Sequence, residues 1–517
     1  MEFVEIGWQV LADPHNVLMV AAGLLLGIVF GALPGLNAIV GVALVLPFTF
    51  SLSPVAALSL LIGLYKGGVY AGSLPAILLN IPGAPEAAAT SLDGNALVRR
   101  GLGAKAIGVS LFASVSGCLV GDLFLIAVAA PLASVALRFG PAEFFALFVF
   151  SLSIVGAVSG RSLTKGIAAA LLGLIVATIG MDQITGTARF TFGVFDLSGG
   201  ISLLSLIMGV FAISEILIQI EESRKTPAAE TASPVAAAAA PAAPGPGKHL
   251  TFREIGSLLP TVLRSSALGA FIGAIPGPGA TTSAFASYAL ERQLSDTPDS
   301  FGKGNIKGVA APDAGNNATC SSTLIPLFTL GIPGAPIAAV FGGALMIHGI
   351  TPGPSMFNSD PTLVTALMIM FVVASLFLLP VGLTASRFSL KLLALPRSIL
   401  YPAVLVLSYT GVYANSSSTF DLIAMSVFGL LGYAMRKVGL PASAFVVAFV
   451  LGAPMESAFK RAMLISQGDP AVFVASPISV LFLVLTVLAC AAVVWQRRRS
   501  AASVEGRNSG KPDDAAM

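Results

Sequence analysis

Residues 17–65 read VLMVAAGLLLGIVFGALPGLNAIVGVALVLPFTFSLSPVAALSLLIGLY and contain no Asp, Glu, Lys, Arg or His. Soluble domains carry about 25% charged residues, whereas this chain of 517 residues has 10%, with 56% hydrophobic side chains and a mean hydropathy of +0.90. One membrane helix needs about 20 apolar residues. Comparable charge-free runs occupy residues 265–290, 314–347, 361–386 and 470–496, so we expect the chain to cross a membrane many times.

The membrane segments are expected to be helices, because no run alternates with the period of two that a membrane barrel requires. We therefore predict an all-α, polytopic integral membrane protein with about 12 membrane segments. The first 35 residues lack the basic region and cleavage site of a secretory signal, so the first apolar stretch is expected to remain as a helix.

A low-complexity Ala/Pro stretch divides the chain near its middle. We predict a first membrane repeat over residues 1–222, a solvent-exposed linker over 223–250, a second repeat over 251–496 and a polar tail over 497–517. Basic residues 497–499 directly follow the last apolar run, which places the C-terminus in the cytoplasm. The sequence leaves the side of the N-terminus unassigned.

Two pairs of motifs indicate an internal duplication. FGALPGLNAIVG at 30–41 resembles IGAIPGPGATTS at 272–283, and aligning their prolines gives an offset of 242 residues. IPGAP occurs at 81–85 and again at 332–336, an offset of 251 residues. Two matches in the same order at similar offsets favour a duplication over chance.

Each of these motifs places Pro-Gly inside an apolar run, and we expect a helix to break there. A break in lipid is tolerated where the freed backbone groups face protein or a water-filled cavity. Broken helices at corresponding positions of two halves indicate a transporter's substrate site. The alternative is a set of kinks that serve only packing, since Gly and Pro are common in membrane helices.

Polar residues lie beside the breaks, and their amides and hydroxyls suit the binding of a carboxylate, as do the positive ends of helices that start after a break. The alternative for Asn316 and Asn317 is a helix cap or an Asx turn. The candidate substrate-binding or ion-binding residues are Pro34, Gly35, Asn37, Lys66, Asn80, Pro82, Gly83, Thr90, Asp93, Pro276, Gly277, Gly279, Thr281, Asn316, Asn317, Thr319, Pro333 and Gly334.

Ionisable residues within apolar runs are functional candidates, each with a plain alternative. Lys66 either pairs with a substrate carboxylate or extends to the membrane interface. Asp122 either binds a coupling ion or occupies a helix end. Glu143 follows Pro141, and capping of a helix start is the better interpretation.

The sequence predicts no enzyme, cofactor or metal site. There is no Walker A motif, His15, His249 and His348 are scattered without HExxH, and no nucleophile elbow is evident. The three cysteines lack metal-ligand spacing, and a net charge of +3 is too small to indicate nucleic acid as a partner.

Taken together, the motifs resemble the large membrane subunit of the tripartite tricarboxylate transporters over residues 20 to 490. The stretches that carry the resemblance are LPGLN at 33–37, YAGSLPAILLNIPGAP at 70–85, TSLDG at 90–94, RFTFG at 189–193, IGAIPGPGA at 272–280, FGKG at 301–304, GVAAPDAGNNAT at 308–319 and LFTLGIPGAPIAAVFGGAL at 327–345.

The resemblance implies a secondary transporter of the bacterial inner membrane that imports a di- or tricarboxylate or a related organic acid with protons or sodium ions. It also implies two partners, a small four-helix membrane subunit and a periplasmic solute-binding protein. The alternatives are a self-sufficient transporter or channel without a binding protein, and a membrane scaffold or sensor that has lost transport.

The family often has a carboxylate after the first IPG-type turn and a Glu in a PEA motif. We expect departures here, with Ala84 and Asp313 in those places and an unusual Lys66. If the duplication forms one central cavity, Asn37 and Asn80 are expected near Thr281 and Asn317.

Overall fold

The computed structural model describes residues 2–33, 36–158, 162–182, 184–225, 249–277, 279–393 and 397–491. The candidates Pro34 and Gly35, nearly all of the linker predicted over 223–250 and the whole tail predicted over 497–517, with its basic cluster, lie outside the described residues.

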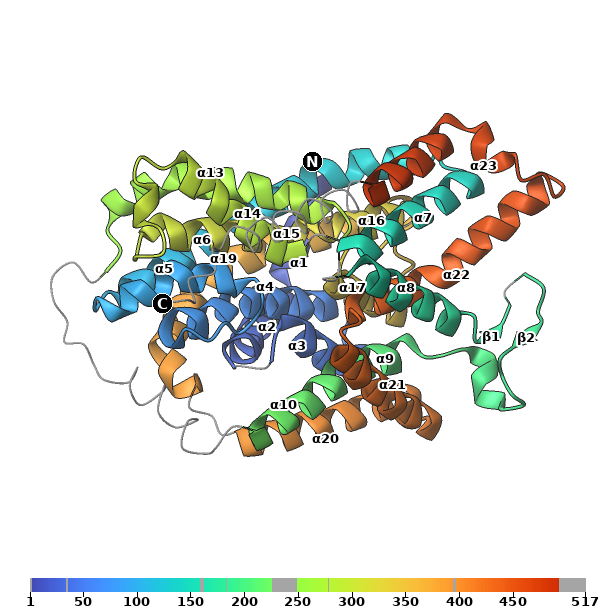
Figure 1. Ribbon diagram of the computed structural model, residues 1–517, viewed down its shortest axis with the longest axis horizontal. Helices are drawn as coiled ribbons and strands as arrows, with labels where there is room; N and C mark the ends of the chain where they lie inside the picture. Colours follow the sequence, from blue (N-terminus) through green and yellow to red (C-terminus); the bar gives the residue numbers. More distant parts are fainter. Residues whose placement is uncertain are drawn as a thin grey trace, which may run out of the picture.

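The first half of the described chain is helical apart from one short hairpin (Figure 1). Helices begin where the sequence supplies caps: Asp13 and Ser53 precede Pro14 and Pro54, and the side chains of both caps accept backbone N–H groups. The elements are α1 (Glu2–Ala12), α2 (Pro14–Ala32), α3 (Ala38–Val45), η1 (Leu46–Ser51), α4 (Pro54–Leu79), α5 (Ala87–Arg99), α6 (Gly103–Ala136), α7 (Pro141–Val158), α8 (Leu163–Ala177), β1 (Gly180–Met181), β2 (Ala188–Arg189), η2 (Phe195–Gly199), α9 (Leu203–Ile207), η3 (Met208–Ile213) and α10 (Ser214–Lys225).

The second half is helical in its described residues. It starts at a capping box in which Thr251 and Glu254 satisfy each other's backbone N–H groups. The elements are α13 (Phe252–Ala274), α14 (Gly279–Leu294), η4 (Pro298–Ser300), α15 (Ile306–Ser322), α16 (Ile325–Leu330), α17 (Pro336–Ile347), α18 (Met356–Ser359), α19 (Pro361–Leu393), α20 (Arg397–Ser416), α21 (Thr419–Val438), α22 (Ala442–Ile465) and α23 (Val472–Ala475).

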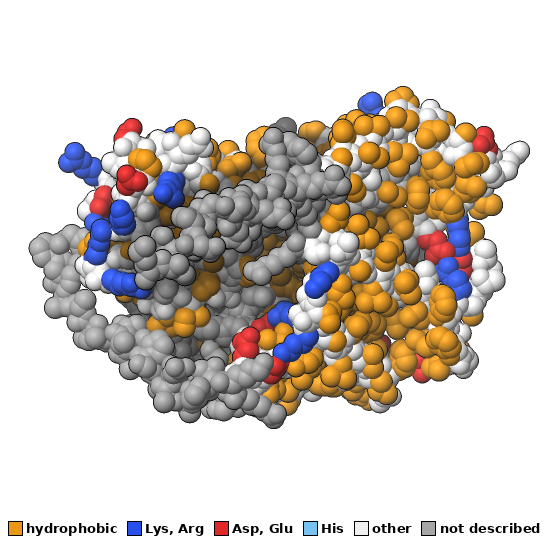
Figure 2. Space-filling view, in the orientation of Figure 1, with side chains coloured by type: hydrophobic (Ala, Val, Ile, Leu, Met, Phe, Trp, Pro, Cys, Tyr) orange, Lys and Arg blue, Asp and Glu red, His pale blue; other side chains and the backbone are white. Residues whose placement is uncertain are grey.

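The helices have the length and surface of a membrane protein. Seven of those described are long and apolar enough to cross a membrane, and shorter apolar helices lie among them. Figure 2 shows hydrophobic side chains over most of the described surface in the right-hand part of the view, while Lys and Arg side chains gather at its left end. Large apolar side chains such as Leu123 and Phe271 are more than half exposed, as lipid-facing residues would be.

Two pairs of helices pack with unusually close backbones. A Cβ added to Gly23, Gly27 or Gly31 of α2 would lie 2.1–2.2 Å from a backbone oxygen of α4. In the second half, a Cβ on Gly269 of α13 would lie 2.1 Å from the carbonyl oxygen of Gly315 on α15. Small residues allow such contact between membrane helices. Gly27 and Gly269 differ by 242 residues, the offset of the two Pro-Gly motifs that follow them.

A helix ends at each of the four Pro-Gly motifs. The interruptions separate α2 from α3, α4 from α5, α13 from α14 and α16 from α17. In the two IPGAP copies the preceding helix ends through a left-handed residue, Asn80 with φ of 58° and Gly331 with φ of 72°. Asn is the non-glycine residue that best tolerates this conformation.

One small feature departs from the all-helical prediction. β1 and β2 pair antiparallel, with Gly180 opposite Arg189 and Met181 opposite Ala188, and the hairpin projects at the edge of the molecule (Figure 1). Its turn is fixed by Asp182, whose Oδ1 accepts the backbone N–H groups of Ile184 and Thr185. Each strand has two residues, which is too short for a hydrophobic period that could distinguish a strand from a helix in the sequence.

Candidate functional site

The four helix interruptions meet at one cavity of about 510 Å³. Every interruption contributes residues to its wall, although the matched interruptions of the two halves lie 242 and 251 residues apart in the sequence. The lining residues from the interruptions and the helix starts behind them are Asn37, Ala38, Ile39, Ala84, Pro85, Glu86, Gly277, Gly279, Ala280, Thr281, Thr282, Gly334, Ala335, Pro336 and Ile337. Tyr65, Val69, Val155, Thr319, Thr323, Ser443 and Val447 complete the wall.

Close backbone contacts hold the interruptions in pairs. In the second half, the Gly277 N–H donates to the carbonyl oxygen of Gly334 at 2.9 Å. Gly277 has φ of 110°, a conformation that side chains disfavour. In the first half, a Cβ on Gly83 would lie 2.7 Å from the carbonyl oxygen of Gly31, so a side chain there would separate the helices. Pro276 and Pro333 flank the second-half contact, and the Pro276 backbone borders Gly334.

The cavity wall carries the side-chain amide of Asn37 and several hydroxyl groups. Asn37 caps α3, with its Oδ1 accepting the Val40 N–H at 3.0 Å. Thr281 and Thr282 lie in the first turn of α14, Thr319 lies in the last turn of α15, and Thr323 directly follows that helix. Helices α3, α14 and α17 begin at the cavity, where their first residues line the wall. Because the N-terminus of a helix carries a partial positive charge, these three helix starts favour an anion in the cavity. The arrangement suits a small polar anion.

Glu86 also lines the cavity, and no other described residue of the wall is an Asp, Glu, Lys, Arg or His. The Thr281 hydroxyl of the other half lies close to the Glu86 carboxylate. The sequence interpretation missed this residue. The expected departure from a PEA motif is wrong, because Pro85, Glu86 and Ala87 form that motif. A lone carboxylate inside a helix interruption was the signal that could have identified it.

Lys66 lies away from the cavity wall, in a buried ion pair. Its Nζ is 2.6 Å from Oδ1 of Asp122 on α6, and it donates to the Phe371 carbonyl oxygen at 2.8 Å and to Ser375 at 2.6 Å. Lys66 and Asp122 are both 0% exposed. Complete burial does not fit the alternative in which Lys66 extends to the interface, and Asp122 lies within a helix rather than at its end.

Asp93 joins the two halves at a second place. Its carboxylate accepts the backbone N–H groups of Gly302, Gly304 and Asn305 at 2.7–2.9 Å and the Tyr288 hydroxyl at 2.9 Å. Four donors on one buried carboxylate fix the loop before α15. This contact connects the TSLDG and FGKG motifs and lies outside the cavity lining.

Thr90 and the two asparagines on α15 lie in the helix packing behind the cavity. Thr90 and Ser73 donate to Oδ1 of buried Asp313 at 2.5 and 2.8 Å. Asn317 donates to Ser114 on α6 at 3.0 Å. The amide of Asn316 is buried and has no hydrogen-bond partner in the part of the chain that the structure describes. It lies one turn before Thr319, whose hydroxyl donates to the Asn316 backbone carbonyl.

The structure thus divides the sequence candidates. Asn37, Gly277, Gly279, Thr281, Thr319 and Gly334 line the cavity. Gly83, Pro276 and Pro333 support it from the interruptions. Asn80 is exposed at the end of α4, followed by exposed Pro82, and neither lines the cavity. The expected neighbours Asn80 and Asn317 are therefore absent from the wall that Asn37 and Thr281 share.

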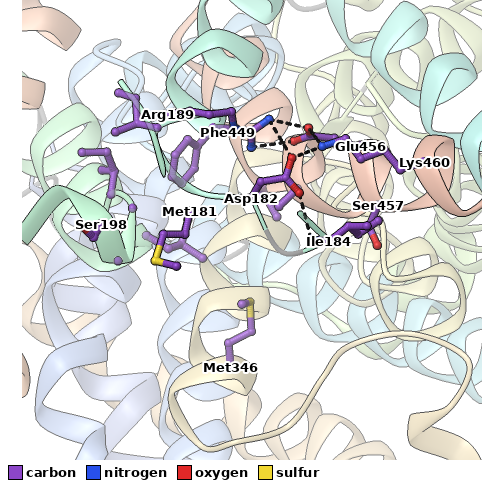
Figure 3. Close-up of a pocket in the computed structure, with 18 residues that line it drawn as sticks. Met181, Asp182, Ile184, Arg189, Ser198, Met346, Phe449, Glu456, Ser457 and Lys460 are labelled. Atoms are coloured by element: carbon purple, nitrogen blue, oxygen red, sulfur yellow. Dashed lines mark hydrogen bonds and ion pairs between the residues drawn. The ribbon is translucent and has the colours of Figure 1, made fainter. Parts of the chain in front are cut away.

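A second cavity, of about 350 Å³, lies between the β1–β2 hairpin and α22 (Figure 3). Arg189 binds Glu456 through two hydrogen bonds of 2.5 and 3.0 Å, and Lys460 pairs with both Glu456 and Asp182. Lys460 and the two backbone N–H groups hold the pKa of the Asp182 carboxyl well below its usual range. The two cations and the two carboxylates neutralise one another. We infer that this cluster anchors the hairpin to α22, at the point where the RFTFG motif begins with Arg189.

Among the described residues, no group of three or more His, Cys, Asp or Glu is placed to hold a metal ion. Long apolar helices, interrupted at paired positions around a polar cavity, define a polytopic membrane protein of the transporter class.

The chain belongs to the tripartite tricarboxylate transporter TctA family, whose profile matches residues 17–447. It is therefore a multi-pass membrane protein of a bacterial transporter family rather than an enzyme, and the family acts in systems with partner components.

Two relatives come from Agrobacterium vitis. One, named as an uncharacterized 52.8 kDa protein in the TAR-I ttuC' 3' region, is 36% identical over 492 residues, covering 95% of each chain. The other, named as an uncharacterized protein in the TAR-II ttuC' 3' region, is 39% identical over 211 residues, covering 41% of this chain and 87% of the relative. No solved structure matches the chain.

Proposed function

We propose that this chain is the permease subunit of a binding-protein-dependent secondary transporter that imports a di- or tricarboxylate, or a related organic acid, across the bacterial inner membrane. The proposal rests on one observation: all four Pro-Gly interruptions contribute to a single cavity of about 510 Å³. A cavity of this size suits a small ligand, and discontinuous helices at paired positions are typical of transporter substrate sites.

The substrate site is the cavity wall formed by Asn37, Thr281, Thr282, Thr319 and Thr323. The side-chain N–H of Asn37 and the Thr323 hydroxyl donate to the substrate's carboxylates, and the helix starts at α3 and α14 add a positive potential. Asn316 on α15 adds a further polar group to the site, because its buried amide has no partner among the described residues and a buried polar group without a partner is costly.

The chain consists of two membrane repeats, residues 1–222 and 251–496, joined by the linker 223–250. Equivalent close contacts support this division. The backbone of Gly27 packs against Leu64, and that of Gly269 packs against Gly315. Gly315 lies 251 residues after Leu64, which is the offset of the two IPGAP motifs. Seven long and five shorter apolar helices among the described residues support about 12 membrane segments.

A small four-helix membrane subunit and a periplasmic solute-binding protein complete the transporter, and a proton or sodium gradient drives it. Family membership supports the partners. No Walker A motif is present in the sequence, which supports a gradient rather than nucleotide hydrolysis as the energy source.

The test is uptake into proteoliposomes that contain this chain and its small subunit, with a panel of radiolabelled di- and tricarboxylates. We expect little uptake until the solute-binding protein is added. Full-rate uptake by the chain alone would favour a self-sufficient transporter, and no uptake of any carboxylate under either ion gradient would contradict the proposal.

A further inference from the structure

The cavity holds an acidic side chain where an anionic substrate is proposed to bind. Glu86 lines the wall between Pro85 and the start of α5, and its carboxylate meets the Thr281 hydroxyl on the opposite side of the duplication. Tyr65 is the only other titratable group of the wall among the described residues, and it is neutral at ordinary pH.

No cation in the described part of the chain offsets Glu86 inside the cavity. Lys66 on α4, next to the lining residue Tyr65, is occupied by Asp122, Ser375 and the Phe371 carbonyl. The remaining lining residues from α7, α15, α17 and α22 are uncharged. An ionised Glu86 would therefore face a substrate carboxylate without a neutralising partner.

The size of the repulsion follows from the cavity. A cavity of about 510 Å³ has a radius of about 5 Å when treated as a sphere, so a carboxylate bound at its centre lies about 6 Å from the Glu86 carboxylate on the wall. At an effective dielectric constant of about 20, two like charges at that distance weaken binding roughly 100-fold. Neutralising Glu86 recovers that factor.

We propose that Glu86 takes up one proton when a substrate carboxylate enters the cavity, so that Glu86 is the residue that couples transport to the proton gradient. This inference rests on the proposed function. The proton comes from the side of entry and binds an oxygen of the Glu86 carboxylate. It leaves with the substrate on the other side, because only the empty cavity favours the ionised form.

The Thr281 hydroxyl fits both states. It donates to the ionised carboxylate and, after rotation, accepts from the protonated one. Since no second acidic residue lines the described wall, a single proton is sufficient to remove its negative charge.

The experiment compares wild-type protein with Glu86→Gln in proteoliposomes holding the complete transporter. The probe is radiolabelled citrate, replaced by another carboxylate of the uptake panel if that one is transported. In wild type we expect apparent affinity to fall about tenfold between pH 6 and pH 8 at constant sodium, and in Glu86→Gln to change less than twofold. Glu86→Gln should exchange labelled for unlabelled substrate yet fail to accumulate it under a pH gradient.

Glu86→Asp serves as the conservative variant and should keep the pH dependence and accumulation. Asp360→Asn, at an exposed helix cap on α19, serves as the matched carboxylate control and should behave as wild type. Unchanged pH dependence in Glu86→Gln would overturn the inference, as would wild-type transport that responds to sodium and not to pH. Either result leaves carboxylate transport standing, whereas a lack of uptake of every carboxylate counts against the proposed function itself.

Discussion

Replacing Lys66 with Met should destabilise the protein through Asp122 rather than weaken substrate binding directly. The two charges lie 2.6 Å apart and are 0% exposed, so even at an effective dielectric constant of about 20 their attraction is about 6 kcal/mol. Removing one partner of a buried pair leaves an uncompensated charge and costs about 3–5 kcal/mol. Ser321 and Ser375 continue to donate to Asp122 and offset part of that cost.

The assay is thermal unfolding of the detergent-purified chain, followed by a thiol-reactive dye. Cys118 and Cys320 are buried and report unfolding, while Cys490 supplies a constant background. We expect a clear drop in midpoint for Lys66→Met and recovery of most of it in the double variant Lys66→Met with Asp122→Leu, since a buried pair is often replaced by apolar residues at little cost. An unchanged midpoint for Lys66→Met, together with lost substrate binding, would refute this reasoning and return Lys66 to the substrate site.

Two further substitutions test the packing that positions the cavity. Asp93→Ala removes the charged acceptor of three backbone N–H groups, and hydrogen bonds to charged groups are each worth about 1.5–3 kcal/mol, so trypsin should cleave after Lys303 many times faster than in wild type. Asp299→Asn, an exposed control in the same segment, should change nothing, and equal cleavage in both variants would contradict the assigned role. Gly269→Leu should prevent accumulation of folded protein, because its Cβ would lie 2.1 Å from a backbone oxygen, whereas Gly256→Leu, with nothing within 4 Å, should be tolerated. Equal yields of the two would show that the close approach of α13 and α15 is unimportant.

The helical membrane architecture could be predicted from the sequence because a bilayer permits few alternatives. Charge-free runs of membrane length and Pro-Gly inside them are local signals, and the structure ends a helix at each motif. The presence of both Gly277 and Gly334 in the cavity wall could also be predicted, because both lie in repeated Pro-Gly motifs.

The destination of individual polar side chains could not be predicted, because it depends on helix rotation. On α4, Lys66 points to Asp122 while its neighbour Tyr65 faces the cavity. On α15, Asn317 faces α6 while Thr319 faces the cavity. Residues one or two positions apart on a helix face different partners, and proximity to a motif in the sequence does not distinguish them.

The central claim is that the carboxylate substrate binds where the four interruptions meet, and cysteine protection tests it most directly. In a background with Cys118, Cys320 and Cys490 replaced, single cysteines are introduced at Thr281, which lines the cavity, and at Asn80, which is exposed outside it. Labelling by a small hydrophilic thiol reagent is measured with and without the transported carboxylate. We predict that substrate slows labelling of Thr281→Cys at least tenfold and leaves the labelling of Asn80→Cys unchanged. Protection at Asn80→Cys without protection at Thr281→Cys would contradict it.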